Sequence, residues 1–286
     1  MAVCGVCFRH CEISEGKTGF CGARICRGGT VTALNYGKIS SLALDPVEKK
    51  PLNRFFPGSL ILSAGSFGCN LRCPFCQNYS ISWSEEALRD ARNAEAISPE
   101  ELARTAAFYR KKGNIGVAFT YNEPLIGYEY VLDTARLVHK AGMKNVLVTN
   151  GTATLPVLEQ LAPYIDAMNI DLKGFTDRYY RDVLKGDRKT VMDFIAAAVK
   201  VCHVELTTLI IPGGNDGEEE MEALSSWIAG LDGGPGRQAG RDIPLHISRF
   251  FPRFRMQDRP ATDVRLIYSL AETARKNLTY VYTGNC

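Results

Sequence analysis

The chain has 286 residues, of which 45% are hydrophobic and 23% charged, and its formal net charge is +3. This length fits one large domain with a substantial core and a small appendage at one end. Nothing in this near-neutral global charge suggests a nucleic-acid or membrane partner, so any binding signal must be local.

The sequence also indicates where in the cell the protein is expected. No stretch has the apolar length that a membrane span requires, and the start, MAVCGVCFRHC, lacks the apolar core of a signal peptide. We therefore expect a cytoplasmic protein with no membrane partner. Eight of its ten cysteines lie within the first 76 residues. Such clustering without a secretory signal favours metal binding over disulfides.

From about Leu60 onward, short apolar runs alternate with amphipathic stretches, as expected of repeated βα units around a parallel sheet. The predicted strands are residues 60–63, 116–120, 145–149, 167–172, 204–211, 244–250 and 280–283. The predicted helices are residues 98–112, 124–141, 154–163, 189–201, 218–229 and 262–276. The first of these helices has an N-cap at Ser98, a first-turn proline and a capping-box acid at Glu101.

This count predicts an α/β fold, a partial (β/α)6 barrel of the TIM type over residues 59–286. Residues 1–58 lack the βα rhythm, and their cysteines, glycines and short apolar runs predict a small metal-binding segment. In such barrels the chemistry lies at the carboxyl ends of the strands. Functional motifs should therefore follow each predicted strand.

A group of three cysteines follows the first predicted strand. Cys69, Cys73 and Cys76 have the spacing C-x3-C-x2-C. Three thiolates can bind three irons of a cubane cluster and leave the fourth iron open to a substrate. The alternatives are a zinc site or buried thiols, but no fourth ligand lies nearby in the sequence, and a structural zinc site normally has four.

The spacing, with the aromatic Phe75 directly before the third cysteine, resembles the signature of the radical S-adenosylmethionine (SAM) superfamily. The resemblance implies a radical SAM barrel in which the three cysteines hold a catalytic 4Fe-4S cluster. SAM then binds the open iron through its amino and carboxylate groups, with Phe75 near the adenine. One electron from the cluster cleaves SAM to methionine and a 5'-deoxyadenosyl radical.

Polar residues follow the next predicted strands, as a SAM site would require. Asn122 and Glu123 lie in TYNEP, which resembles a segment of glycyl-radical activating enzymes, and they are candidates for binding the SAM ammonium. Thr149 and Asn150, in a segment similar to the TNG of pyruvate formate-lyase activating enzyme, are further cofactor candidates.

The fourth predicted strand ends in a charge pair. Asp171 and Lys173 alternate onto one face of the strand, in a segment similar to the DLK of the same enzyme. Lys173 is placed to reach the SAM carboxylate, and Asp171 to bind ribose or orient Lys173. The alternative is an ordinary salt bridge at a strand end.

The last strand ends give weaker signals. Ile211 and Gly213 lie in a tight turn that suits an adenine contact, although a plain turn explains them nearly as well. His246 is a cofactor candidate, or else a core histidine with a satisfied ring.

Basic and aromatic residues interleave in HISRFFPRFRM. Ser248, Arg249 and Arg253 are candidates for gripping a carboxylate or phosphate of the substrate. Nucleic acid is the alternative ligand for such a surface, but the arginines are few.

The N-terminal cysteines form a second group. Cys4, Cys7, Cys11 and Cys21 have the spacing C-x2-C-x3-C-x9-C, which can close a tetrahedral thiolate site, and His10 could replace one ligand. The metal is either zinc, which would fold a small segment, or an auxiliary iron-sulfur cluster, which would relay electrons. The sequence does not decide, with zinc slightly favoured, and four unrelated thiols are the remaining alternative.

The N-terminal cysteines, DPVEKKPL, GCNLRCPFCQN, TYNEP, TNG, NIDLKGF and HISRFFPRFRM together resemble the radical SAM member of the AmmeMemoRadiSam system, over nearly the whole chain. That family resembles pyruvate formate-lyase activating enzyme. The resemblance implies AMMECR1-like and Memo-like partner proteins, by analogy only. It also implies an electron donor such as flavodoxin or ferredoxin.

The predicted function is reductive cleavage of SAM, followed by hydrogen abstraction from a protein, peptide or small-molecule substrate, as in glycyl-radical activases. A rival is a non-catalytic iron-sulfur or zinc protein with an electron-transfer or structural role, which would have no need of polar residues around one mouth. A third hypothesis is a radical SAM enzyme that modifies nucleic acid, whose binding would weaken steeply with salt.

Overall fold

A computed structural model describes residues 1–85, 88–89 and 95–286 of the chain. Its centre is an eight-stranded sheet in which the strands follow one another in chain order. Every neighbouring pair from β6 to β12 is parallel, and β5 joins β6 antiparallel. The strands are β5 (Ser41–Pro46), β6 (Leu60–Gly65), β7 (Asn114–Phe119), β8 (Lys144–Thr149), β9 (Ala167–Asp171), β10 (His203–Ile210), β11 (Leu245–Arg249) and β12 (Val281–Gly284).

Helices connect the parallel strands, so the predicted alternation of strands and helices is confirmed. They are α1 (Tyr79–Ser82), α3 (Pro99–Phe108), α4 (Tyr128–Lys140), α5 (Leu155–Leu161), α6 (Arg188–Ala198), α7 (Glu218–Ala229) and α8 (Val264–Arg275). Short 3-10 or π turns are η1 (Val47–Lys49), η2 (Tyr109–Lys112), η3 (Pro124–Gly127), η4 (Tyr179–Leu184) and η5 (Gly240–Asp242). The capping box at Ser98 is formed, since its hydroxyl accepts from the Glu101 amide at 3.2 Å.

Two predicted helices are shorter than expected because tighter turns occupy one end. The predicted helix 98–112 is α3 followed by η2, which ends at Gly113 in a left-handed conformation. The predicted helix 124–141 begins with η3, and α4 starts only at Tyr128.

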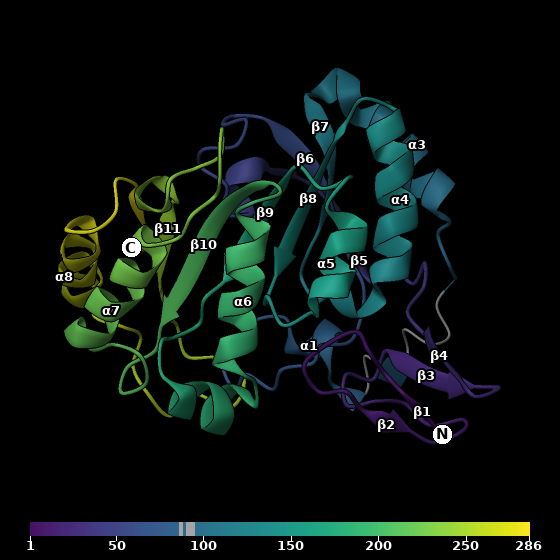
Figure 1. Cartoon of the computed structure of the whole chain (residues 1–286), viewed down its shortest axis with the longest axis horizontal. Coiled ribbons are helices and arrows are strands. Elements are labelled where there is room, and N and C mark those ends of the chain that lie inside the picture. Colours follow the sequence, from purple (N-terminus) through teal and green to yellow (C-terminus); the bar gives the residue numbers. More distant parts are fainter. Residues whose placement is uncertain (86–87, 90–94) are drawn as a thin grey trace.

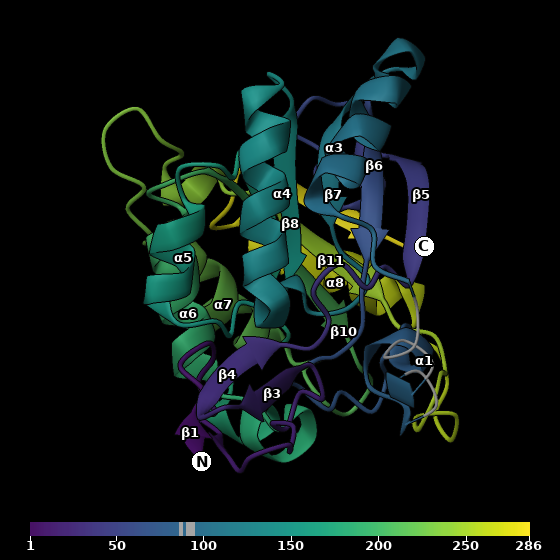
Figure 2. The ribbon, with the colours of Figure 1, turned by 90° about the vertical axis from the view of Figure 1, so that its right-hand side faces the viewer.

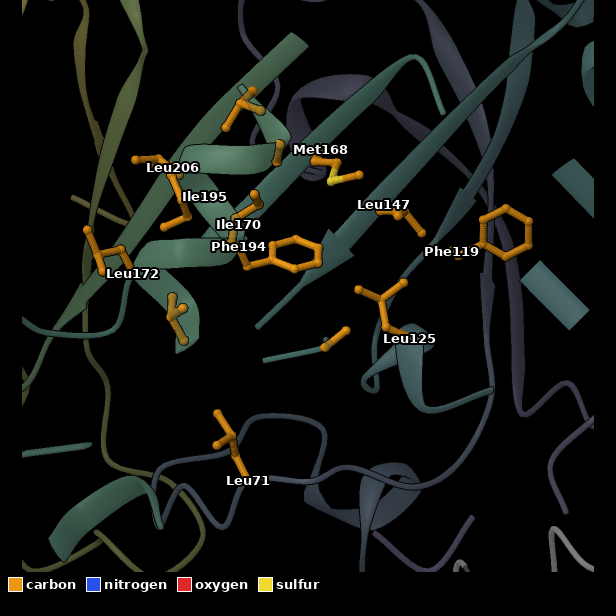
Figure 3. Close-up of a cluster of buried hydrophobic side chains, with 14 of the residues drawn as sticks. Leu71, Phe119, Leu125, Leu147, Met168, Ile170, Leu172, Phe194, Ile195 and Leu206 are labelled. Atoms are coloured by element: carbon orange, nitrogen blue, oxygen red, sulfur yellow. The ribbon is translucent and has the colours of Figure 1, made fainter. Parts of the chain in front are cut away.

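The hydrophobic core lies between the sheet and its covering helices. Figure 3 shows Phe194 of α6 among Leu147, Ile170 and Leu206 of the central strands. Leu71, from the loop that carries the three cysteines, is 1% exposed and belongs to the same cluster. Burying a leucine side chain stabilises a fold by roughly 1.5–3 kcal/mol. Leu71 therefore anchors the cysteine loop to the core.

The N-terminal segment forms two small hairpins outside the sheet. β1 (Ala2–Val3) pairs with β2 (Glu12–Ile13), and β3 (Arg24–Arg27) pairs with β4 (Thr30–Ala33). Both hairpins lie at the end of the sheet to which the parallel strands point (Figures 1 and 2). Hydrogen bonds hold them there, including one of 3.0 Å from the Thr154 amide to the Val6 carbonyl.

The segment outside the sheet is shorter than the predicted residues 1–58. β5 pairs with β6 along its whole length and forms one edge of the sheet (Figure 2). An antiparallel edge strand gives no βα signal, which is why the sequence placed it with the cysteine-rich segment. Within the described residues, no helix has the length and apolarity needed to cross a membrane.

Candidate active site

A cavity of about 800 Å³ opens at the carboxyl ends of the parallel strands. Its lining comes from residues in or after all eight strands of the sheet, from Asp45 in β5 to Asn285 beyond β12. Binding sites for small molecules typically measure about 300–1,000 Å³. The sheet is therefore shaped to enclose one site for a cofactor together with a small substrate or part of a larger one.

Cys69, Cys73 and Cys76 line this cavity from the loop after β6. The loop turns sharply at Gly68, whose φ is 92° and where a Cβ atom would lie 2.6 Å from Ala23. A glycine is required there by both the backbone conformation and the close packing. The amide of Cys76 donates to the carbonyl of Cys73 at 3.2 Å, which closes the turn between them.

The three thiols are held in their protonated form by their surroundings. Burial raises the pKa of Cys73 to about 12 and also raises the pKa values of Cys69 and Cys76. Thiolates are the metal-binding form, so loading a metal must release protons. Soft thiolate ligands suit an iron-sulfur cluster. The residues present therefore fit a cluster held on three irons.

Glu123 is a buried carboxylate at the centre of the cavity wall. It accepts hydrogen bonds from the Thr149 hydroxyl at 2.7 Å, the Asn150 amide at 2.7 Å and the Leu125 amide at 3.0 Å. Burial still raises the pKa of Glu123 to about 7, against the lowering effect of these bonds. A preorganised carboxylate in this position suits a cationic ligand group such as an ammonium.

The predicted roles of Asn122, Thr149 and Asn150 differ from what their side chains do in the structure. Thr149 and Asn150 line the cavity, but the Thr149 hydroxyl and the Asn150 backbone amide both donate to Glu123. The Asn150 side-chain amide donates to Asn70 Oδ1 at 2.9 Å. The Asn122 side-chain amide donates to the carbonyls of Phe67 and Gly68, both at 3.1 Å. Asn122 Oδ1, the atom that could accept from an ammonium, already accepts from the Ser66 amide at 3.0 Å, so Asn122 shapes the turn that precedes Cys69.

Asp171 and Lys173 form the predicted pair, with the Lys173 Nζ 2.8 Å from an Asp171 carboxylate oxygen. Both line the cavity. Burial would lower the pKa of Lys173, but Asp171 and Cys73 together raise it, so the ammonium stays charged. Lys173 in turn lowers the pKa of Cys73 against burial. A fixed cation thus lies beside the thiols.

His246 and Ser248 also line the cavity, as predicted, because alternate residues of β11 face it. His246 Nε2 lies 2.7 Å from Glu205, and its ring stacks on Tyr282 at 5.2 Å between centroids. Glu205 has no exposed side chain. Burial raises the pKa of Glu205, yet hydrogen bonds from His203, His246 and the Arg54 amide lower it to about 2.

Four predicted site residues lie outside the cavity lining: Ile211, Gly213, Arg249 and Arg253. Each has a local reason. Ile211 is buried in the core, and Gly213 is in an exposed turn. Arg249 alternates with Ser248 onto the other face of β11 and donates to the Thr262 carbonyl at 2.7 Å. Arg253 is exposed beyond the strand.

One set of cavity residues, those of DPVEKKPL, had no chemistry assigned to it from the sequence. Lys50 is only 3% exposed and pairs with Asp45 at 2.8 Å. Asp45 also accepts from the Tyr121 hydroxyl at 2.8 Å. Burial raises the pKa of Asp45, but Lys50 and Tyr121 lower it to about 2. Three consecutive charges between two prolines were the available signal, although nothing local showed that Lys50 is the one that is buried.

The N-terminal cysteines lie apart from this cavity. Cys4, Cys7, Cys11 and Cys21 line a second, small cavity between the N-terminal hairpins and the main fold. Across residues 1–85, 88–89 and 95–286, no three His, Cys, Asp or Glu side chains lie close enough to bind a single metal ion. This holds for both cysteine groups. The four thiols therefore surround a common space without converging on one point.

Comparison with known sequences places the chain in a family. A sequence model of the Radical SAM superfamily matches residues 65–228, more than half of the chain. An uncharacterized protein of Methanocaldococcus jannaschii is 37% identical over 284 residues, which cover 99% of this chain and 80% of that protein. Pyruvate formate-lyase 1-activating enzyme of Escherichia coli (strain K12) is 25% identical over 166 residues, which cover 56% of this chain and 65% of that enzyme.

Solved structures share the fold. Streptococcus suis SuiB bound to S-adenosylmethionine superimposes with a TM-score of 0.58 at 13% identity, over 80% of this chain and 52% of that chain. A radical SAM methyltransferase from Sphaerobacter thermophilus gives 0.56 at 16% identity, over 80% of this chain and 67% of that chain. The match of the cysteine-bearing region, the parallel sheet and the relative from M. jannaschii agree, and the chain belongs to the radical SAM superfamily.

Proposed function

We propose that the protein cleaves SAM reductively at a 4Fe-4S cluster held by Cys69, Cys73 and Cys76. One observation carries the proposal: three thiols with no fourth cysteine open into a cavity whose other walls carry charged residues. When bound, the cluster and SAM supply one-electron cleavage of the sulfonium, with methionine and a 5'-deoxyadenosyl radical as products. The protein orients the reactants and excludes water.

Three further residues bind SAM in this proposal. Glu123, fixed by Thr149 and Asn150, accepts from the SAM ammonium. Lys173, fixed by Asp171 at 2.8 Å, pairs with the SAM carboxylate. Phe75, which lines the cavity and is 4% exposed, lies against the adenine.

The radical abstracts hydrogen from a protein, peptide or small-molecule substrate, as in glycyl-radical activases. The similarity to the E. coli activating enzyme supports this reaction type. The ion pair of Asp45 and Lys50 lines a polar part of the cavity that the proposed SAM contacts do not use. That space suits a polar or charged substrate group.

We further infer that the chain is the radical SAM member of the AmmeMemoRadiSam system, with a partial (β/α)6 barrel and a metal-binding N-terminal segment. The motifs from DPVEKKPL to HISRFFPRFRM support this assignment. The inferred setting is the cytoplasm, with flavodoxin or ferredoxin as electron donor and AMMECR1-like and Memo-like proteins as partners.

The test is anaerobic reconstitution with iron and sulfide, reduction with dithionite in the presence of SAM, and detection of 5'-deoxyadenosine by mass spectrometry. Wild-type protein is expected to form the product, and Cys73→Ala is expected to form none. Cys202→Ser is the matched control, because Cys202 is buried outside both cysteine groups. A fully loaded wild-type protein that forms no product would favour an electron-transfer or structural role.

A further inference from the structure

Basic and aromatic side chains alternate beside the loop that carries the three cysteines, outside the lining of the large cavity. The Arg9 guanidinium lies 3.5 Å from the centre of the Phe20 ring, and the Arg72 guanidinium lies 4.0 Å from the same centre. Arg72 also lies 5.0 Å from the centre of the Trp83 ring. Cations are attracted to aromatic rings at such distances. The N-terminal segment, the cysteine loop and the end of α1 therefore meet in one row of side chains.

The row continues into the loop after β11. The Arg255 guanidinium lies 5.4 Å from the centre of the Trp83 ring and 5.2 Å from that of Phe254. The Phe254 ring stacks on Tyr79 at 4.2 Å and meets Trp83 edge-on at 5.1 Å between centroids. Figure 2 shows α1, which begins at Tyr79, beside this yellow-green loop. We call the row the basic patch, and its members are Arg9, Phe20, Arg72, Trp83, Phe254 and Arg255.

Carboxylates do not balance the positive charges of the basic patch. Among the residues that the structure describes, no ion pair includes Arg9, Arg72 or Arg255. Backbone carbonyls hold two of them, since Arg9 Nε donates to Asn70 and Arg72 Nη1 donates to Cys69, both at 2.8 Å. A carbonyl acceptor fixes a guanidinium without neutralising its charge. The patch therefore presents fixed cations that attract a negatively charged surface.

The basic patch is open to solvent at both ends. Phe20 is 39% exposed at one end, and Arg255 is exposed at the other. Two further exposed cations flank it: Lys185, whose carbonyl accepts from Arg9, and Arg253, in the turn that carries Arg255. Arginine and aromatic side chains are enriched at interfaces between proteins. The patch therefore has the composition and the charge to bind an acidic protein.

The basic patch also adjoins the ligands of the proposed cluster. Arg72 directly precedes Cys73, and the Arg255 amide donates at 3.0 Å to the carbonyl of Pro74, which directly follows Cys73. In the proposed function SAM and the substrate occupy the cavity side of this loop. A protein that delivers electrons therefore reaches the cluster most directly from the side of the patch.

We propose that the basic patch is the docking surface for an acidic one-electron carrier protein of the flavodoxin type, which reduces the cluster on Cys69, Cys73 and Cys76. The carrier's anionic flavin hydroquinone loses one electron and becomes the neutral semiquinone. The cluster takes up that electron, and no proton moves. Complementary charge speeds the encounter and fixes its orientation. The electron transfer rests on the proposed function, whereas the docking of an acidic protein does not.

Docking is tested by the rate of cluster reduction in the absence of SAM. The reconstituted protein is mixed anaerobically with reduced flavodoxin in a stopped-flow instrument, and loss of the cluster absorbance gives the rate. Arg255→Glu should lower the second-order rate constant by about tenfold at low ionic strength, because electrostatic steering raises association rates by about 10- to 1,000-fold. The difference should shrink at high salt. Arg255→Lys, which keeps the charge, should restore most of the rate.

A charge reversal elsewhere on the surface is the matched control. Arg104→Glu makes the same change of charge at an exposed site on α3, outside the basic patch. Excess dithionite should reduce the same amount of cluster in every variant, as measured by electron paramagnetic resonance (EPR). Equal rates for Arg255→Glu and Arg104→Glu at low ionic strength would overturn the docking surface.

A binding measurement separates this proposal from the proposed function. Oxidised flavodoxin is titrated into the protein by calorimetry, and Arg255→Glu should raise its dissociation constant by about tenfold at low ionic strength. If the wild-type protein held no cluster or cleaved no SAM, the proposed function would fail, and this titration would still decide the docking surface. Single-stranded RNA that binds wild type but not Arg255→Glu, while flavodoxin binds both equally, would assign the patch to nucleic acid and overturn the proposal.

Discussion

Two walls of the cavity are formed by different parts of the sheet. The cluster wall consists of Cys69, Cys73 and Cys76 with Glu123, Asp171 and Lys173, which lie at or after the ends of the parallel strands β6, β7 and β9. The edge wall consists of Asp45 in β5 and Lys50 beyond it with Tyr282 and Asn285 at β12, and β5 and β12 are the two edges of the sheet. The residues of the cluster wall belong to short sequence motifs at strand ends. The edge wall, in contrast, forms only because the two edge strands of the sheet face the same cavity. We therefore assign SAM cleavage to the first wall and substrate contact to the second.

The largest effect is expected from removing one cysteine ligand of the proposed cluster. Cys73→Ala should abolish formation of 5'-deoxyadenosine, because a cubane with only two protein thiolates is not held at this loop. Iron analysis of the variant should show that the iron bound at this loop is lost. Product formation at the wild-type rate in Cys73→Ala would separate the cysteine loop from the chemistry.

Glu123→Gln should lower the rate of SAM cleavage at subsaturating SAM by about 100-fold, since losing one partner of a desolvated charge pair costs roughly 2–5 kcal/mol. The cluster content should stay unchanged. Steady-state assays with varied SAM give the measurement. Glu159→Gln, on the exposed side of α5, is the control.

Glu123 also predicts a pH dependence of stability in the metal-free protein. Its pKa in the fold, about 7, lies above the ordinary value of about 4.3. The folded state therefore binds the proton more tightly, and this stabilisation is fully present below about pH 4.3 and is lost as pH rises to 7 and beyond. Such a shift corresponds to roughly 4 kcal/mol. Urea unfolding at pH 5 and pH 8 should show a smaller loss of stability in Glu123→Gln than in wild type.

Asp171→Asn should weaken SAM use by about 10- to 100-fold, because a hydrogen bond to a charged group contributes about 1.5–3 kcal/mol. Lys173 loses the carboxylate that fixes it, but no cluster ligand changes. The expected readout is a raised KM for SAM with unchanged iron content. Asp182→Asn, which alters an exposed pair with Arg181, should behave as wild type. If Asp171→Asn lost iron, Asp171 would be needed for the structure of the cluster site and not for SAM binding.

The smallest effect on SAM cleavage is expected from the edge wall. Lys50→Met replaces a buried ammonium with an apolar chain of similar length and breaks the 2.8 Å pair with Asp45. Uncoupled cleavage of SAM should be nearly unchanged, whereas reaction with the substrate should fall. A loss of SAM cleavage equal to that of Asp171→Asn would remove the distinction between the walls.

The sequence predicted the cluster wall because its signals are local. Hydrophobic runs and caps located six of the helices and the parallel strands, and the helix predicted at residues 218–229 coincides with α7. The three cysteines, Glu123 and the Asp171–Lys173 pair follow those strands and line the cavity. Neighbouring parallel strands end at the same edge, so position in the chain sufficed to bring these side chains together.

The edge wall and the orientation of the last strand ends could not be predicted from local signals. The pairing of β5 with β6 is a tertiary contact, and it places Asp45, the partner of the buried Lys50, in the sheet. Arg249 and Arg253 carried the right charge for a substrate but lie outside the lining. Asn122 has an acceptor oxygen that suits an ammonium, yet that oxygen already accepts from the Ser66 amide. Whether each of these residues is available to a ligand depends on the direction of its side chain and on its other hydrogen bonds, which local sequence patterns do not show.

The most direct test of the central claim is whether SAM binds the open iron beside Cys69, Cys73 and Cys76. The reduced, reconstituted protein is examined by EPR and electron-nuclear double resonance with SAM labelled with oxygen-17 in its carboxylate. The account predicts a changed cluster signal and a hyperfine coupling to the label, both absent in Cys73→Ala. An unchanged signal and no coupling in the fully loaded wild-type protein would contradict it.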